Sequence, residues 1–249
     1  MPTGDDKTAQ ATELLALLWR HHLPAKPGAR GPKQTLTVDD VVAAAIALAD
    51  RDGIAKLTIR AVAAALGVRA MSLYTYVPSK EALITLMVDA VAATDPPIPA
   101  ELPVRDRMIA IAARIRAELL AHPWLLEVSP WRQVLGPGRL RRYERQLAAI
   151  EGIGLSDLAM DRAIAVLTDF ATGNARLAVA AAGATAQLSD ADWWEITGPL
   201  LARVIPPDEF PLAGRVGTTV GEHHQAPADP DGAFDYGVAT LVDGLLTDT

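Results

Sequence analysis

Residues 57–80, with the sequence LTIRAVAAALGVRAMSLYTYVPSK, constrain the fold more than any other segment. Their first half places apolar residues on one face of a helix, at Ile59, Val62, Ala63 and Leu66. Gly67 follows, at the point where a tight turn between two crossed helices needs a positive φ. A second short helix is expected over residues 69–76. The segment therefore predicts a helix-turn-helix.

The charge of this segment differs from that of the whole chain. The stretch from Lys56 to Lys80 holds four basic residues and no acidic residue, namely Lys56, Arg60, Arg69 and Lys80. The chain as a whole carries a formal net charge of -7. Residues 94–249 hold 13 basic and 21 acidic residues, a net of -8, and should repel nucleic acid. Any contact with phosphate is therefore expected in the N-terminal third.

The composition favours packed helices. Half of the residues are hydrophobic but only 5% are aromatic, so strand-forming runs are scarce. The absence of cysteine excludes a disulfide framework and a thiolate metal site. The acidic start with its short apolar run is a poor signal peptide. No apolar run of about 18 residues exists, so we expect a cytoplasmic protein without a membrane span.

Helical patterns continue through most of the chain. Thr37, with Asp40 three residues later, predicts a capped helix over residues 38–51. Another helix is expected after Ser79, to about residue 93, and the four prolines of residues 94–103 mark a hinge or boundary. Further helices are expected over residues 104–121, 124–132, 137–151, 156–183, 190–205 and 233–247. Residues 206–232 hold five Pro and four Gly, which predicts a long irregular loop.

The first 35 residues form a separate region. One short helix is expected from Ala11 to Arg20, followed by HHLPAKPGARGPKQ, which contains no acidic residue. This composition predicts a flexible basic arm over residues 1–35. The arm either follows the DNA backbone or minor groove, or is a solvated tail without a role.

The N-terminal part resembles the DNA-binding domain of the tetracycline repressor family of bacterial transcription factors. The resemblance rests on the helix from Val38, on LTIRAVAAALGV (57–68) and on SLYTYVPSKEAL (72–83). Its most specific feature is the order of Leu73, Tyr74, Val77 and Lys80. HPWL (122–125) and FDYGVATLVDGL (234–245) are similar to the tetracycline-repressor-like C-terminal subclass.

The resemblance implies an all-α protein with two domains. A small helix-turn-helix DNA-binding domain is expected over residues 36–93. A larger helical domain over residues 104–249 would bind a ligand and form the dimer. The implied function is that of a ligand-responsive transcriptional regulator, in particular a repressor that binds a palindromic operator as a homodimer and is released by a small molecule. An activator, or a sensor of a protein partner, on the same fold is the alternative.

The resemblance places the second helix of the motif in the major groove of double-stranded DNA. Arg60 is the candidate for a direct base contact, with a phosphate as its alternative partner, and Thr58 lies beside it in the first helical turn. Ala70 and Met71 offer apolar contact, for instance with a thymine methyl group. Arg69 either reads a base or binds phosphate. The remaining candidates, expected on phosphates or packed within the DNA-binding domain, are Ser72, Tyr74, Thr75, Tyr76 and Lys80.

The larger helical domain, residues 104–249, which we call the body, is expected to bind a second copy and an effector. The family dimer implies a four-helix bundle built from helices at about 156–183 and 233–247, with Ala175 and Phe234 among the packing residues; an intramolecular core is the alternative. The effector is expected to be a largely hydrophobic small molecule. Its candidate contacts are the polar or aromatic residues of apolar helices: His122, Trp131, Tyr143, Gln146, Asp169, Asn174 and Trp193.

The sequence does not favour an enzyme. It contains no GxSxG, no phosphate-binding loop, no HExxH and no cysteine nucleophile, and GPG at 136–138 lacks the features of a dinucleotide site. We therefore assign no catalytic residue, no cofactor and no metal. The loop pair His223 and His224 lacks a helical ligand spacing and is weak evidence for a metal.

Overall fold

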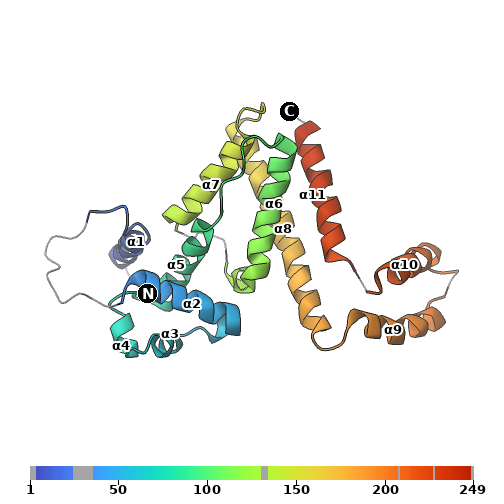
Figure 1. The fold of residues 1–249 in the computed structure, drawn as a ribbon, viewed down its shortest axis with the longest axis horizontal. Coiled ribbons are helices and arrows are strands. Elements are labelled where there is room, and N and C mark those ends of the chain that lie inside the picture. The colour runs from blue at the N-terminus through green and yellow to red at the C-terminus, as the bar shows by residue number, and fades with distance from the viewer. Residues whose placement is uncertain (1–3, 25–35, 130–133, 207, 227, 248–249) are drawn as a thin grey trace. The chain divides into compact units, whose positions relative to one another are not determined.

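A computed structural model describes residues 4–24, 36–129, 134–206, 208–226 and 228–247. Every regular element within these ranges is a helix, as Figure 1 shows. This confirms the predicted all-α class. It agrees with a composition rich in alanine and leucine, which lose little side-chain freedom in a helix.

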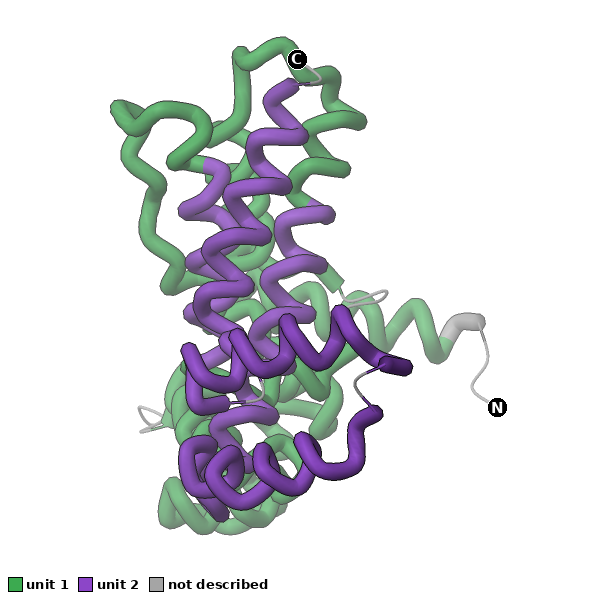
Figure 2. The backbone as a smooth tube through the Cα atoms, turned by 90° about the vertical axis from the view of Figure 1, so that its right-hand side faces the viewer, with its two compact units in different colours: residues 1–107, 121–164 green, residues 108–120, 165–249 purple. Residues whose placement is uncertain are grey.

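The chain forms two compact units (Figure 2). The first comprises residues 1–107 and 121–164, and the second comprises residues 108–120 and 165–249. Two long helices, α6 (Val104–Ala121) and α8 (Asp157–Thr185), contribute residues to both. No described helix has the length and apolar character needed to cross a membrane.

The first unit contains what we call the head, residues 36–93. Its elements are α2 (Val38–Asp52), η1 (Ile54–Lys56), α3 (Ile59–Ala65), α4 (Ala70–Leu73) and α5 (Lys80–Ala93). Apolar side chains from these helices form one buried cluster, which includes Val41, Val62, Leu73, Val77, Leu83 and Met87. The same cluster also includes Leu18 and Trp124 from outside residues 36–93, and α3 and α4 are held on it.

Three helices of the head begin with a side-chain cap, including the one predicted at Thr37. Thr37 accepts a hydrogen bond from the Asp40 backbone, and the Asp40 carboxylate accepts one from the Thr37 backbone N–H at 2.8 Å. The Thr58 hydroxyl accepts a bond from Ala61 N–H at 3.1 Å, and Ser79 does the same for Ala82. Each cap satisfies a backbone donor that the helix itself leaves without a partner.

Two expected helices are shorter than predicted. The expected helix at 69–76 is the single turn of α4, followed by a turn in which Val77 N–H donates to the Leu73 carbonyl at 2.9 Å. After Leu73 the chain continues in tighter turns, in which Thr75 N–H donates to the Ser72 carbonyl at 3.3 Å and Tyr76 N–H donates to the Leu73 carbonyl at 2.9 Å. The expected helix at 124–132 is the 3-10 helix η2 (Pro123–Glu127).

The expected flexible arm differs from the structure over residues 4–24. Helix α1 (Gly4–Leu18) occupies most of this range, and Leu18 is only 2% exposed within the core of the head. The indole N–H of Trp19 donates to the Leu135 carbonyl at 3.1 Å. Burial of leucines in α1 explains the docking, and the basic residues 25–35 lie outside the described residues.

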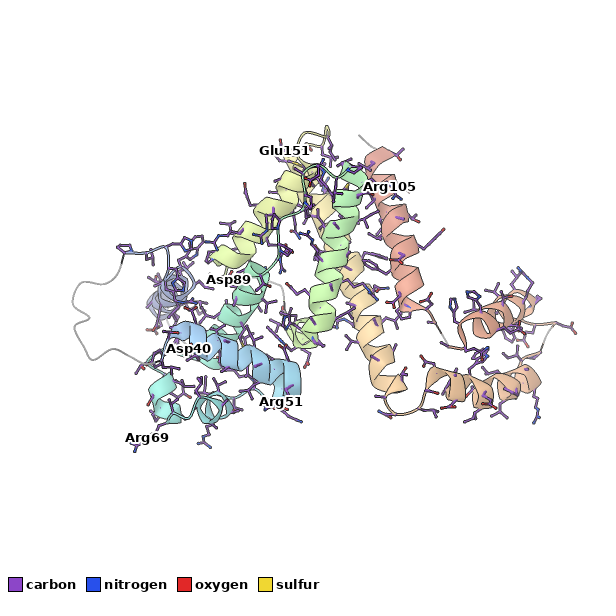
Figure 3. The ribbon with its side chains drawn as sticks, viewed as in Figure 1. Asp40, Arg51, Arg69, Asp89, Arg105 and Glu151 are labelled. Atoms are coloured by element: carbon purple, nitrogen blue, oxygen red, sulfur yellow. The ribbon has the colours of Figure 1, made fainter. Side chains whose placement is uncertain are left out.

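A close joint connects α5 to α7 (Pro137–Ile150) within the first unit. The buried carboxylate of Asp89 accepts hydrogen bonds from the backbone N–H groups of Gly138 at 3.1 Å and Arg139 at 2.9 Å. Gly136 and Gly138 permit this approach, because a Cβ at either position would lie within 2.3 Å of an Asp89 atom. The GPG segment thus serves helix packing, and Figure 3 shows Asp89 at the joint.

The second unit contains three further helices, α9 (Asp190–Val204), α10 (Pro211–His224) and α11 (Pro230–Thr247). Helix α10 corrects the expectation of an irregular loop over residues 206–232. Its glycines do not break the helix: Gly221 gives room to the Trp194 ring of α9, since a Cβ there would lie 1.7 Å from Trp194 Cζ2. Gln225, with a φ of 51°, ends the helix.

Candidate nucleic-acid interface

The turn of the helix-turn-helix has the conformation that the sequence predicts. Gly67 has a φ of +68°, which residues with a Cβ rarely adopt. Val68 N–H donates to the Ala63 carbonyl at 3.0 Å across this turn, and this bond satisfies a carbonyl at the end of α3. The turn therefore fixes where α4 begins relative to α3.

Exposed side chains gather at the start of α3 and along α4. Met71 is 78% exposed and Tyr74 is 49% exposed. Thr58, Arg60, Arg69, Ser72 and Thr75 are exposed as well. Leu73 and Val77 are fully buried beneath them and hold α4 on the core.

The two arginines of the motif, Arg60 and Arg69, differ in their pairing from Arg51, an arginine on α2. Neither Arg60 nor Arg69 has a hydrogen-bond or ion-pair partner within the described part of the chain. Arg51 instead pairs with Asp52, with 2.6 Å between Nη2 and Oδ2, and its pKa is raised by this hydrogen bond. Figure 3 shows Arg69 at the outer edge of the head, beside α4. Two guanidinium groups at the motif are thus available to an anionic partner.

Three predicted contact residues are less accessible than the sequence suggested. Ala70 and Tyr76 are half-buried and pack against the core of the head. Lys80 is half-buried, and its Nζ lies 3.4 Å from the carbonyl oxygen of Ile54. The Thr75 hydroxyl donates to the Ser72 carbonyl at 2.7 Å, so it has a partner within its own turn.

Some candidate effector contacts have structural partners in the first unit. His122 Nδ1 and the indole N–H of Trp124 both lie 2.7 Å from Oδ1 of Asp50, and Trp124 is 1% exposed. The Tyr143 hydroxyl donates to Asp161 at 2.8 Å, and this bond raises the pKa of Tyr143. Gln146 is buried, whereas Trp131 lies outside the described residues. The contacts of His122 and Trp124 with Asp50 give the HPWL segment (122–125) a structural role in packing.

The other candidates lie in the second unit. Asp169 is exposed. Asn174 accepts a hydrogen bond from Nε of Arg116 at 2.6 Å and donates to the Pro230 carbonyl at 2.8 Å. Trp193 is half-buried beside Trp194, with ring centroids 6.1 Å apart. Asn174 on α8 thus links this helix to α6 and to the start of α11 by hydrogen bonds.

Sequence reasoning missed Arg116 on α6. Its guanidinium pairs with Asp231 and lies 4.9 Å from the centre of the Phe234 ring. Phe234 stacks on Phe170 of α8 at 5.7 Å, and Gly237 is covered by the same Phe170 ring. Phe234 and Val238 therefore belong to the intramolecular core of this unit. The arginine and its partners are 58 and 115 residues apart, so no local pattern reveals them.

A cleft of about 700 Å³ lies between α9 and α10. Its walls are mostly apolar and include Leu201, Ile205 and Phe210, and its few charged residues are Glu195, Arg215 and Glu222. A volume of this size is typical of sites for small molecules. No group of three potential metal-binding side chains occurs among the described residues, those of His223 and His224 included.

Comparison with known proteins identifies the family. Residues 41–87 match the description "Bacterial regulatory proteins, tetR family", and residues 98–249 match "Tetracyclin repressor-like, C-terminal domain". The chain belongs to the tetR family. A curated relative, the HTH-type transcriptional repressor DrrR1 of Streptomyces coeruleorubidus, is 37% identical over 93% of this chain and 84% of its own length.

Solved structures agree with this assignment. Apo ActR of Streptomyces coelicolor has a TM-score of 0.70 at 25% identity, covering 87% of this chain and 97% of ActR. ActR in complex with actinorhodin has a TM-score of 0.69 at 24% identity, covering 86% and 97%. This member of the tetR family is a DNA-binding transcriptional regulator, and its helix-turn-helix is formed by α3 and α4.

Proposed function

We propose that the protein is a ligand-responsive repressor that binds a palindromic operator as a homodimer and releases it when a small molecule binds. One observation carries the DNA-binding part of this proposal. Arg60 and Arg69 have no acidic partner within the described residues, although the chain carries a net charge of -7. An acidic protein that keeps two guanidinium groups unpaired on one motif is suited to bind phosphate or base edges. Such a regulator works in the cytoplasm, where the DNA is.

Arg60 is the proposed base reader. A guanidinium can donate two hydrogen bonds to the edge of a guanine, and Arg60 lies in the capped first turn of α3. Arg69 binds a phosphate or a second base, and the exposed side chain of Met71 contacts an apolar base edge. Ser72, Tyr74 and Thr58 position the motif on phosphates. Lys80 and Tyr76 contribute only after their partly buried side chains rearrange.

The proposed dimer reads two half-sites that are related by two-fold symmetry. One head contacts too few base pairs for useful selectivity, and a symmetric dimer doubles the contact. Helices α8 and α11 expose large apolar side chains that such a dimer would cover: Val166, Leu177 and Tyr236. Phe234 and Val238 belong to the chain's own core, so the exposed residues Val166, Leu177 and Tyr236 are the proposed dimer contacts.

The proposed effector is a largely hydrophobic small molecule. The ActR structures in complex with actinorhodin and with (S)-DNPA support this, because they show that a protein of the same fold holds organic ligands. Release follows if the effector binds the conformation in which the two heads no longer fit both half-sites. The effector's differential affinity for the two conformations sets how strongly it releases DNA.

Selection of duplex DNA from a random pool, at two salt concentrations, tests this proposal. Recovery of a symmetric site, with affinity that falls steeply with salt, is the expected result. Arg60→Ala should relax the preference at one base pair per half-site and cost about 1–3 kcal/mol. Arg51→Ala is the matched control, since Arg51 is exposed but paired with Asp52. Uniform weakening of all sequences by Arg60→Ala would overturn the base-reading role.

A further inference from the structure

The arginines of α7 form a cluster that the proposed contact with DNA does not use. Arg139, Arg142 and Arg145 follow one another at intervals of three residues and are half-buried, whereas Arg141 on the same helix is exposed. Helix α7 packs against α5 (Figure 1), and the half-buried side of such a helix is normally apolar. Three cations on that side therefore need a physical explanation.

Buried guanidinium nitrogens without a hydrogen-bond partner gather on this helix. Among the described residues, Nη1 of Arg139 and both Nε and Nη2 of Arg145 are out of contact with solvent and lack an acceptor. Buried donors are almost always paired in folded proteins, and a buried charge without a partner is costly. An acceptor from outside the chain would remove that cost.

The two free nitrogens of Arg145 belong to one edge of its guanidinium group. Nε and Nη2 direct their N–H bonds to the same side of the planar group. A carboxylate or a phosphate presents two oxygens at the spacing of this edge and accepts both hydrogen bonds at once. The free edge therefore favours an oxyanion over an acceptor that offers a single atom.

The nearby carboxylates do not satisfy this edge. Oδ2 of Asp95 lies 4.0 Å from Nη2 of Arg145 and 3.9 Å from Nε of Arg142, and both distances exceed that of a hydrogen bond. Asp89 uses its carboxylate on two backbone N–H groups at the start of α7. The chain itself thus balances the charge of the three arginines only in part.

The arginines also affect one another. Burial lowers the pKa of Arg139, Asp89 opposes this effect, and the positive charge of Arg142 adds to it. An anion beside these guanidinium groups would favour their charged forms. The side chains of Arg142 and Arg145 are 19% and 25% exposed, so the cluster lies close enough to the surface for a small anion to reach it.

We propose that Arg139, Arg142 and Arg145 bind the carboxylate or phosphate group of a small molecule, with the Nε–Nη2 edge of Arg145 as the bidentate donor. Arg139 donates from its free Nη1, and Arg142 adds positive charge. The site requires neither DNA nor a second copy of the chain, so it stands apart from the repressor function proposed above. Since α7 packs on α5, it lies beside the last helix of the head.

Isothermal titration calorimetry of the full-length chain tests the site, with inorganic phosphate and benzoate as probes and sodium chloride holding the ionic strength constant. One saturable site per chain is expected for at least one probe, and the probe that binds distinguishes a phosphate from a carboxylate ligand. Benzamide has the shape of benzoate without its charge and should not bind. Saturable binding of neither probe, or equal binding of benzamide and benzoate, would overturn the proposal.

Variants of α7 locate the binding. Arg145→Leu removes the free edge and should abolish binding, whereas Arg145→Lys keeps the charge without the edge and should weaken binding on the order of tenfold. Arg141→Leu, at an exposed position of the same helix, is the matched control and should bind like the parent chain. If Arg145→Leu binds the probe like the parent chain, the assignment is wrong.

Thermal unfolding without any probe separates binding from a structural role. Arg145→Leu removes a partly buried charge that has no hydrogen-bonded carboxylate, so its unfolding midpoint should equal or exceed that of the parent chain. This result, together with the loss of binding, is expected of a residue that serves a ligand. A lower midpoint would assign Arg145 to the stability of the fold and reject the site.

Discussion

The carboxylate of Asp89 accepts a hydrogen bond of 2.9 Å from the backbone N–H of Arg139, and thereby joins the last helix of the head to the start of α7. The same carboxylate accepts the N–H of Gly138 at 3.1 Å. A negative group at a helix N-terminus satisfies free donors and interacts favourably with the helix dipole. Burial lowers the pKa of Arg139, against the opposing effect of Asp89.

Gly138→Ala should destabilise the protein by about 1–3 kcal/mol, the usual cost of forcing extra atoms into a packed contact. The added Cβ would lie 2.0 Å from the Asp89 carbonyl oxygen, which is backbone and cannot move alone. Urea unfolding measures the change. Gly173→Ala on α8 is the control: no atom lies within 4 Å of its added Cβ, and alanine should be neutral or stabilising there. Equal effects at the two positions would contradict the packing argument.

Asp50→Leu should cost roughly 2 kcal/mol, because it leaves the buried indole N–H of Trp124 without an acceptor. Asp50→Asn keeps an oxygen for that bond and should cost less. The free energy of unfolding of the two variants, measured under the same conditions, gives the comparison. If Asn and Leu are equally tolerated, the bonds of Asp50 to His122 and Trp124 do not stabilise the fold.

The pairing of Asp39 on α2 with Arg20 and His21, which follow α1, should make the stability of the protein depend on pH. Partial burial raises the pKa of this carboxyl, but hydrogen bonds and charge from Arg20 and His21 outweigh that effect and lower it below 3.8. A lowered pKa contributes stability above the unfolded value and loses it as pH falls through the folded value. The stability difference between the parent chain and Asp39→Asn should therefore shrink between about pH 5 and about pH 2. A difference that is constant over this range would show that the pairing is absent.

Tyr74→Phe should weaken binding to every DNA sequence by about 0.5–1.5 kcal/mol, the usual contribution of one hydrogen bond. The phenol is 49% exposed on the proposed DNA-facing surface, so its hydroxyl can reach a phosphate. Binding is measured on the selected site and on scrambled duplexes. Tyr143→Phe is the control, because that hydroxyl binds Asp161. Loss confined to one base pair would assign Tyr74 to base reading.

The head could be predicted from the sequence because its determinants are local. Thr37, Thr58 and Gly67 act on residues within a few positions, and the apolar spacing of α2 and α3 identifies the core face directly. The early end of α4 at Leu73 is not evident from the sequence, because the residues after it remain in tight i→i−3 turns that the local pattern does not distinguish from an α-helix.

The body could be predicted only in outline. Asp89 binds residues about 50 positions away, and Arg116 binds Asp231 at a separation of 115 positions, so no sequence window contains both partners. Helix α10 is not evident from the sequence, because its proline and glycine content is also typical of an irregular loop. At Gly221 the glycine instead gives room to Trp194. The docking of α1 is likewise not evident from the sequence, because the residues that bury its leucines lie in distant parts of the chain.

The approach of Asp89 to Gly136 and Gly138 also limits how the gene can change. Any replacement of a glycine adds a Cβ, and at both positions that atom would overlap Asp89. Substitutions at residues 136 and 138 are therefore disfavoured. The exposed positions of α7, such as Leu140 and Glu144, can accept substitutions. Descendants of this chain can acquire new surfaces on α7 while they inherit an unchanged joint to the head.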